Sequence, residues 1–169
     1  MEERFLNNSR IWLAFECERL EKLFLEVWEA LPAGERDFLK DKISKVSDQF
    51  DPTYNQLRIP KSKRTRVTGT YFHTPSEIVI NPALAAELPE FFIRYVCAHE
   101  LGHAFSYLSA LSLIDEIEKN RGPMESGERN RMLTLSQRES IADMFAKEWG
   151  FPRFPKTLLH NKKDLRKQG

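Results

Sequence analysis

The sequence predicts an α+β fold for a single domain that spans residues 1–169. Three observations predict it. Apolar residues recur every three or four positions through the first fifty residues, which is the spacing of helices. Between residues 53 and 82, runs of β-branched and aromatic residues indicate strands, and helical spacing returns after Pro89. We therefore expect an N-terminal helical pair, a small antiparallel β-sheet and a second helix pair, in that order.

The N-terminal helical part is expected to cover residues 1–52. Its first helix runs from a cap at Ser9 to about residue 31, where Pro32 and the residues after it end it. A wide apolar stripe on this helix predicts contact with more than one neighbour, and it contains Leu13, Leu20, Phe24, Val27 and Leu31. A second helix is expected over 34–48. It ends before Asp51-Pro52, because the residue before a proline avoids the helical region.

The core, residues 53–150, opens with three predicted strands. They are Gln56–Ile59, Arg66–His73 and Glu77–Asn81, and turn residues separate them. A basic run, Lys61–Arg66, lies between the first two. A solvated turn is the favoured interpretation of such a run, and a patch for nucleic acid or a protein partner is the alternative.

Helices are expected through the rest of the core. Residues 82–88 form a short turn, Pro89 opens a long helix over about 89–109, and a further segment follows at 113–120. A polar loop is predicted over 121–130. Ser136 is then expected to cap the last helix, with Glu139 completing a capping box, and this helix ends at Trp149-Gly150. The basic tail, 151–169, includes His160, which we interpret as a surface residue.

Composition limits the possible function classes. Hydrophobic residues make up 41% and charged residues 30% of the chain, which is typical of a soluble globular domain. The net charge of +1 argues against an electrostatic nucleic-acid binder, so we expect no nucleic-acid partner. Cys17 and Cys97 are interpreted as buried free thiols of a reducing compartment. No apolar run could span a membrane and no secretory signal is visible, so the expected location is cytoplasmic.

The stretch His99-Glu100-Leu101-Gly102-His103 is the main candidate functional motif. Two histidines four residues apart lie on one face of a helix, where both can bind one Zn²⁺ ion. Glu100, one residue after the first histidine, can reach a water molecule on the metal. Gly102 is unfavourable in the middle of a helix by about 1 kcal/mol relative to alanine, so close approach by another backbone is expected there.

The alternative is that His99 and His103 are ordinary core histidines that are hydrogen-bonded to carboxylates. The last helix offers Glu139 and, one turn later, Asp143 on the same face, and Ala142 beside them permits close helix packing. Collecting two histidines and three acids in a core without a cation would bury unfavourable negative charge. The pattern therefore favours a metal site.

The motif His99–His103, together with the segment Glu139–Ala146, resembles the gluzincin pattern of zinc metallopeptidases. More narrowly, it is similar to the ImmA/IrrE family of bacterial and phage regulatory metallopeptidases, and the similarity covers about residues 66–150. The fold that this resemblance implies has a zincin-type metal-binding helix pair. It also implies one Zn²⁺ held by His99, His103 and Glu139, with Glu100 as the general base. Asp143 would orient a zinc-bound histidine through its other ring nitrogen.

An extended substrate could add to the sheet along the short strand before the motif helix, whose residues are Ile78, Val79, Ile80 and Asn81. A further group should stabilise the oxyanion of the transition state. Tyr107, one turn after His103, is the first candidate, and His73, Tyr71 and Arg138 follow. For each of these four residues, an ordinary packing or surface role is the simpler interpretation.

The sequence therefore predicts a cytoplasmic zinc metalloendopeptidase that acts on a protein or peptide. Members of the family that it resembles cleave a cognate repressor or other regulatory protein. The alternative is a zinc-binding regulatory protein that acts by binding a partner without proteolysis. The wide apolar stripe of the N-terminal helices motivates this alternative, because such a stripe could dock a partner.

Overall fold

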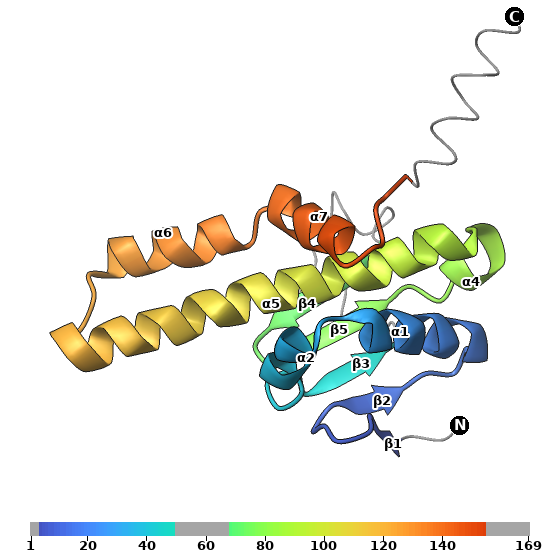
Figure 1. Ribbon diagram of the computed structural model, residues 1–169, viewed down its shortest axis with the longest axis horizontal. Helices are drawn as coiled ribbons and strands as arrows, with labels where there is room; N and C mark the ends of the chain where they lie inside the picture. The colour runs from blue at the N-terminus through green and yellow to red at the C-terminus, as the bar shows by residue number, and fades with distance from the viewer. Residues whose placement is uncertain (1–3, 50–67, 155–169) are drawn as a thin grey trace, which may run out of the picture.

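The computed structural model describes residues 4–49 and 68–154, and these form an α+β arrangement with six helices and a five-stranded mixed sheet. The long helix α5 (Glu90–Arg121) lies between the sheet and the segment that contains α6 and α7 (Figure 1). None of the described helices is both long enough and apolar enough to cross a membrane. The expected α+β class is thus confirmed, whereas several of its elements differ from those expected.

The prediction of an N-terminal helical pair is wrong in part, because three strands lie in this region. The described elements are β1 (Arg4–Phe5), β2 (Trp12–Ala14), α1 (Glu18–Ala30), α2 (Ala33–Leu39) and β3 (Lys45–Ser47). The run from Ile11 to Phe15 is almost entirely buried, so it is apolar on both faces, and its spacing resembles that of a buried helix. Ser9 caps no helix: its hydroxyl donates to the Leu6 carbonyl at 2.7 Å and accepts from the Ile11 amide at 3.1 Å.

The sheet is mixed rather than antiparallel, and its strand order is β1-β2-β3-β5-β4. Two of the expected strands are present, as β4 (Gly69–His73) and β5 (Ser76–Ile80), which pair antiparallel. Strands β2, β3 and β5 are parallel to one another. Leu13, Val46 and Ile78 lie in register across them and are fully buried. The expected strand Gln56–Ile59 and the basic run Lys61–Arg66 lie outside the described residues.

The helices after the sheet are longer than expected. The two segments predicted at 89–109 and 113–120 are one helix, α5, which follows the short helix α4 (Leu84–Glu87). Most of the predicted loop at 121–130 is helical, since α6 spans Ser126–Ser136, and only residues 122–125 connect it to α5. An ion pair of 3.0 Å between Arg129 and Glu118 links the two helices.

Helix α7 (Glu139–Glu148) ends before Gly150, as expected, where φ is +96°. The predicted cap and capping box at its start are wrong. Ser136 belongs to the last turn of α6, and its hydroxyl donates to the Leu133 carbonyl at 2.6 Å. Glu139 is the first residue of α7, and its side chain takes no part in a capping box.

Both cysteines are free thiols, as expected. Cys97 on α5 is fully buried, and burial raises the pKa of its thiol to about 12. Cys17 is only half-buried.

The start of helix α1 is held by a residue distant in the sequence. Asp48 directly follows β3 and is 4% exposed. Its carboxylate accepts hydrogen bonds from the backbone amides of Glu16, at 2.9 Å, and Cys17, at 2.8 Å. Glu16 and Cys17 directly precede α1, so these hydrogen bonds fasten the start of the helix to the end of β3.

Replacing Asp48 by alanine should lower the free energy of unfolding by about 1–3 kcal/mol, because two amides would lose a buried acceptor. Urea denaturation of the purified protein measures this. Asp41→Ala is the matched control: its side chain is 53% exposed, and a change within about 0.5 kcal/mol is expected. Equal effects of the two substitutions would contradict the assigned role of Asp48.

Candidate metal centre

The centre lies where α7 crosses α5, and Gly102 permits this crossing. A Cβ atom placed on Gly102 would lie 2.9 Å from the Ala142 carbonyl oxygen and 3.1 Å from the Ala142 Cα. These are backbone atoms of α7, so no side chain larger than that of glycine fits without moving the helix. The close approach that the sequence predicts at Gly102 is therefore present, and its partner is α7.

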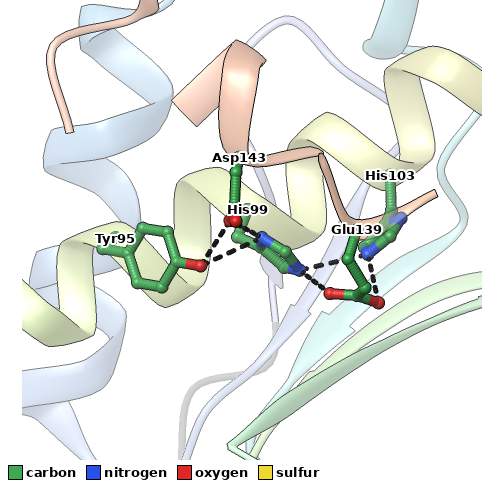
Figure 2. A network of polar contacts seen from close by, with 5 residues as sticks. All are labelled: Tyr95, His99, His103, Glu139 and Asp143. Carbon is green, nitrogen blue, oxygen red and sulfur yellow. Dashed lines mark hydrogen bonds and ion pairs between the residues drawn. The ribbon is translucent and has the colours of Figure 1, made fainter. Parts of the chain in front are cut away.

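Three side chains converge beside this crossing (Figure 2). Nε2 of His99 lies 3.1 Å from Nε2 of His103 and 2.8 Å from one carboxylate oxygen of Glu139. The other oxygen of Glu139 lies 3.1 Å from Nε2 of His103. The histidines come from successive turns of α5, and Glu139 comes from the first turn of α7. Together, these three residues form a group that could hold a metal ion.

The remaining nitrogen of His99 is also engaged. Nδ1 of His99 donates to Oδ1 of Asp143 at 2.7 Å, and the hydroxyl of Tyr95 donates to the same oxygen. With a metal ion bound, His99 would keep its proton on Nδ1 and present the lone pair of Nε2 to the ion, on the side of the ring where His103 and Glu139 lie. Asp143 thus contacts His99 as the resemblance implies for an orienting carboxylate.

This donor set fits zinc. Two imidazole nitrogens and one carboxylate are typical protein ligands of catalytic Zn²⁺, and tetrahedral bonds of about 2.0–2.2 Å put neighbouring ligand atoms roughly 3.3–3.5 Å apart. The three contacts here measure 2.8–3.1 Å, a few tenths of an ångström shorter. The Glu139 side chain is 78% exposed, so a small outward rotation can lengthen its two contacts with the histidines.

The electrostatics of the group favour a positive charge at its centre. Burial lowers the pKa of His99, but Glu139, Glu100 and Asp143 outweigh that effect and raise the pKa to about 9. The two histidines in turn hold the pKa of Glu139 well below its usual range, against a smaller opposing effect of burial. A cation between the imidazole nitrogens and Glu139 would supply the charge that these carboxylates attract.

Glu100 lies on the side of α5 that faces the sheet and is 5% exposed. Burial raises the pKa of its carboxyl group to about 7, and the neighbouring histidines oppose this shift. A Cβ atom on Gly69 of β4 would lie 3.2 Å from Cγ of Glu100, and a backbone hydrogen bond from Tyr71 stabilises the charged form of the carboxyl group. Strand β4 therefore packs directly against this carboxylate.

A cavity of about 210 Å³ opens between β4, α5 and the start of α7. It brings together Glu100, His103 and Glu139 with residues of the adjacent strand. The complete lining consists of Gly69, Thr70, Tyr71, His73, Glu100, His103, Gln137 and Glu139. Two of the three candidate metal ligands, His103 and Glu139, thus share one opening with the buried acid Glu100.

The strand that was expected to bind the substrate does not lie at an edge of the sheet. Strand β5, which contains Ile78, Val79 and Ile80, lies between β3 and β4 and pairs with both, so neither of its edges is open. Asn81 lies directly after the strand, and its backbone N–H donates to the Thr68 carbonyl at 2.9 Å. The expectation that a substrate adds to this strand is therefore wrong. In the described part of the chain, β4 is the strand at that end of the sheet and pairs with β5 alone.

The four candidates for oxyanion stabilisation differ in position. Tyr107 is 7% exposed and packs beneath His73, with ring centroids 4.7 Å apart, and it is absent from the cavity lining. Tyr71 lines the cavity, but its hydroxyl is hydrogen-bonded to Ser76 at 2.8 Å. Arg138 is exposed at the start of α7. His73 is exposed and lines the cavity.

His160, which was interpreted as a surface residue, lies outside the described residues.

Sequence reasoning missed Tyr95. Its hydroxyl contacts both Asp143 and Nδ1 of His99, the latter at 3.3 Å. Burial and the nearby Asp143 raise its pKa above the ordinary value for tyrosine, so the hydroxyl is a hydrogen-bond donor at neutral pH. Its position four residues before His99 was the available signal, because that spacing puts both on one helix face.

Comparisons with protein-family models, curated proteins and solved structures found no significant match. The resemblance to gluzincins and to the ImmA/IrrE family therefore depends on the sequence of residues 66–150, chiefly on the two motif segments.

Gly102→Ala should lower the free energy of unfolding by about 1–3 kcal/mol, because the added methyl group meets the backbone of α7. Thermal or urea unfolding measures the change. Gly127→Ala on α6 is the matched control, since a Cβ there has no atom within 4 Å, and its stability should stay the same or rise by up to about 1 kcal/mol. Equal stability of the two variants would contradict the close crossing of α5 and α7.

Proposed function

We propose that this protein is a zinc-dependent metalloendopeptidase that hydrolyses a peptide bond in a protein substrate. The observation that carries the proposal is the convergence of His99, His103 and Glu139, two of which, His103 and Glu139, line one open cavity together with the buried Glu100. The motif resemblance supports a repressor or another regulatory protein as the substrate class.

Four residues of the chain would have distinct roles in the reaction: three would hold the metal and one would transfer a proton. His99, His103 and Glu139 would hold Zn²⁺ and leave one position open, which is the arrangement of catalytic rather than structural zinc sites. When bound, the ion supplies Lewis acidity toward a water molecule and the substrate carbonyl.

Glu100 would serve as the proton carrier. Its carboxylate would take a proton from the attacking water while the new carbon–oxygen bond forms. It would then pass that proton to the nitrogen as the carbon–nitrogen bond breaks. Its position in the cavity wall, shielded from bulk solvent by β4, supports this role.

The outer edge of β4 would receive the substrate in an extended conformation. Gly69, Thr70, Tyr71 and His73 of this strand all line the cavity, so a peptide paired with β4 would pass the metal centre. His73 is the candidate best placed to contact the substrate from the strand side, because the other three are buried, hydrogen-bonded elsewhere or outside the cavity lining.

The alternative was a regulatory protein that binds a partner without proteolysis. It was motivated by the apolar stripe of the N-terminal helices, which could dock a partner. The apolar side chains of α1 that were expected to dock a partner are instead buried in the core of this protein. They are Leu20, Leu23, Phe24, Val27 and Trp28.

Glu100→Gln should keep zinc bound at one ion per chain while lowering the rate of peptide hydrolysis by at least about 10²-fold, since proton transfer is lost. Zinc is measured by elemental analysis, and hydrolysis is measured on a fluorescence-quenched peptide library with mass spectrometry of the products.

Two further variants complete the experiment. Glu148→Gln, an exposed site on α7, should leave zinc content and hydrolysis unchanged. Glu139→Ala should lose both zinc and hydrolysis. Full hydrolysis by zinc-loaded Glu100→Gln would overturn the peptidase mechanism. A zinc-loaded wild type that cleaves no peptide or protein would favour partner binding instead.

A further inference from the structure

We propose that Tyr95 is a positioning residue of the metal centre: its hydroxyl holds Asp143 against Nδ1 of His99 and so keeps Nε2 of His99 directed at the metal. This inference rests on the proposed zinc site and assigns a role to a residue that would touch neither metal nor substrate.

The contacts form a closed triangle on the side of His99 that faces away from Glu139 (Figure 2). Oδ1 of Asp143 accepts from both the Tyr95 hydroxyl and Nδ1 of His99, and the Tyr95 oxygen lies 3.3 Å from that nitrogen. Tyr95 and His99 come from successive turns of α5, whereas Asp143 comes from α7, 44 residues after His99. The triangle therefore joins the same two helices that the metal would join.

The side chains of Asp143 and Tyr95 differ in their exposure to solvent. The Asp143 side chain is 45% exposed, so water competes for its oxygens and the carboxylate can rotate. Tyr95 is 8% exposed, and its ring packs against Phe92, with ring centroids 5.5 Å apart. A buried, packed donor beside a partly exposed carboxylate favours the carboxylate orientation that meets His99.

Loss of the hydroxyl should weaken metal binding through His99. A carboxylate that turns toward water no longer holds the Nδ1 proton of His99, so the imidazole can rotate or move its proton to Nε2. A protonated Nε2 offers no lone pair to the metal. Partners of this kind commonly change metal affinity by about 10- to 100-fold.

The test is Tyr95→Phe, which keeps the ring and removes the oxygen. Zinc affinity is measured by competition with a chromophoric chelator, using Zn²⁺ alone as the ligand. The dissociation constant should rise by about 10- to 100-fold. Tyr107→Phe is the matched control, because Tyr107 is a buried tyrosine of the same helix that contacts His73 rather than Asp143, and its dissociation constant should stay within twofold of wild type.

A double-variant cycle separates positioning from packing. If Tyr95 acts through Asp143, the pair Tyr95→Phe and Asp143→Ala should bind zinc no more weakly than Asp143→Ala alone. Losses that multiply would overturn the proposal, and so would an unchanged dissociation constant for Tyr95→Phe. Circular dichroism verifies the fold of each variant. If Tyr95→Phe does not fold, Asp143→Asn supplies the second test, and an unchanged zinc affinity in that variant also overturns the proposal.

The same titration distinguishes this inference from the proposed function. A wild-type protein that fails to bind zinc would overturn the zinc site and this inference with it. Tight zinc binding by wild type and equally tight binding by Tyr95→Phe would overturn only the role of Tyr95.

Discussion

The close crossing of α5 and α7 is the constraint on which the candidate centre depends. With Gly102 against the backbone of Ala142, the two helices lie near enough for Glu139 and Asp143 to reach His99. A second close approach lies on the sheet side of α5, where Gly69 faces Val96 and Glu100. Two glycines thus permit α7 and β4 to lie close against one helix, and His103, Glu139 and the buried Glu100 line the same cavity beside it.

The polar contacts around His99 divide into two sets with different roles. Nε2 faces Glu139 and His103, where a metal would lie, and Nδ1 faces Asp143 and Tyr95. Every polar atom of this buried imidazole therefore has a partner, and each set includes one residue of α7. The ring is held from both ends, which is what a ligand of fixed geometry requires.

Local signals in the sequence predicted the features that depend on neighbours along the chain. Pro89 and Gly150 marked helix boundaries, and the spacing of His99 and His103 put them on one face of a helix. Glu139 and Asp143 were recognised through the motif resemblance, and the structure brings both to His99. Gly102 signalled a close approach, because a glycine in the middle of a helix needs a reason.

Features that depend on distant partners were missed. Ile11–Phe15 is apolar at nearly every position, so its periodicity could not separate a buried strand from a helix. The parallel pairing of β2, β3 and β5 depends on registers between distant segments. Asp48 holds the start of α1 from 31 residues away, a distance at which no helix-start pattern can be read. Strand β5 was expected to be open to a substrate, because sequence alone does not reveal which strand ends a sheet.

Both imidazoles lie on one uninterrupted helix, so their spacing is set locally, whereas the third candidate ligand comes from a distant segment. Helix α5 forms through contacts between near neighbours, whereas Glu139 meets His103 only when the chain closes a loop of 36 residues. A divalent cation already held by the histidine pair would attract the Glu139 carboxylate and offset part of the entropy lost in that closure.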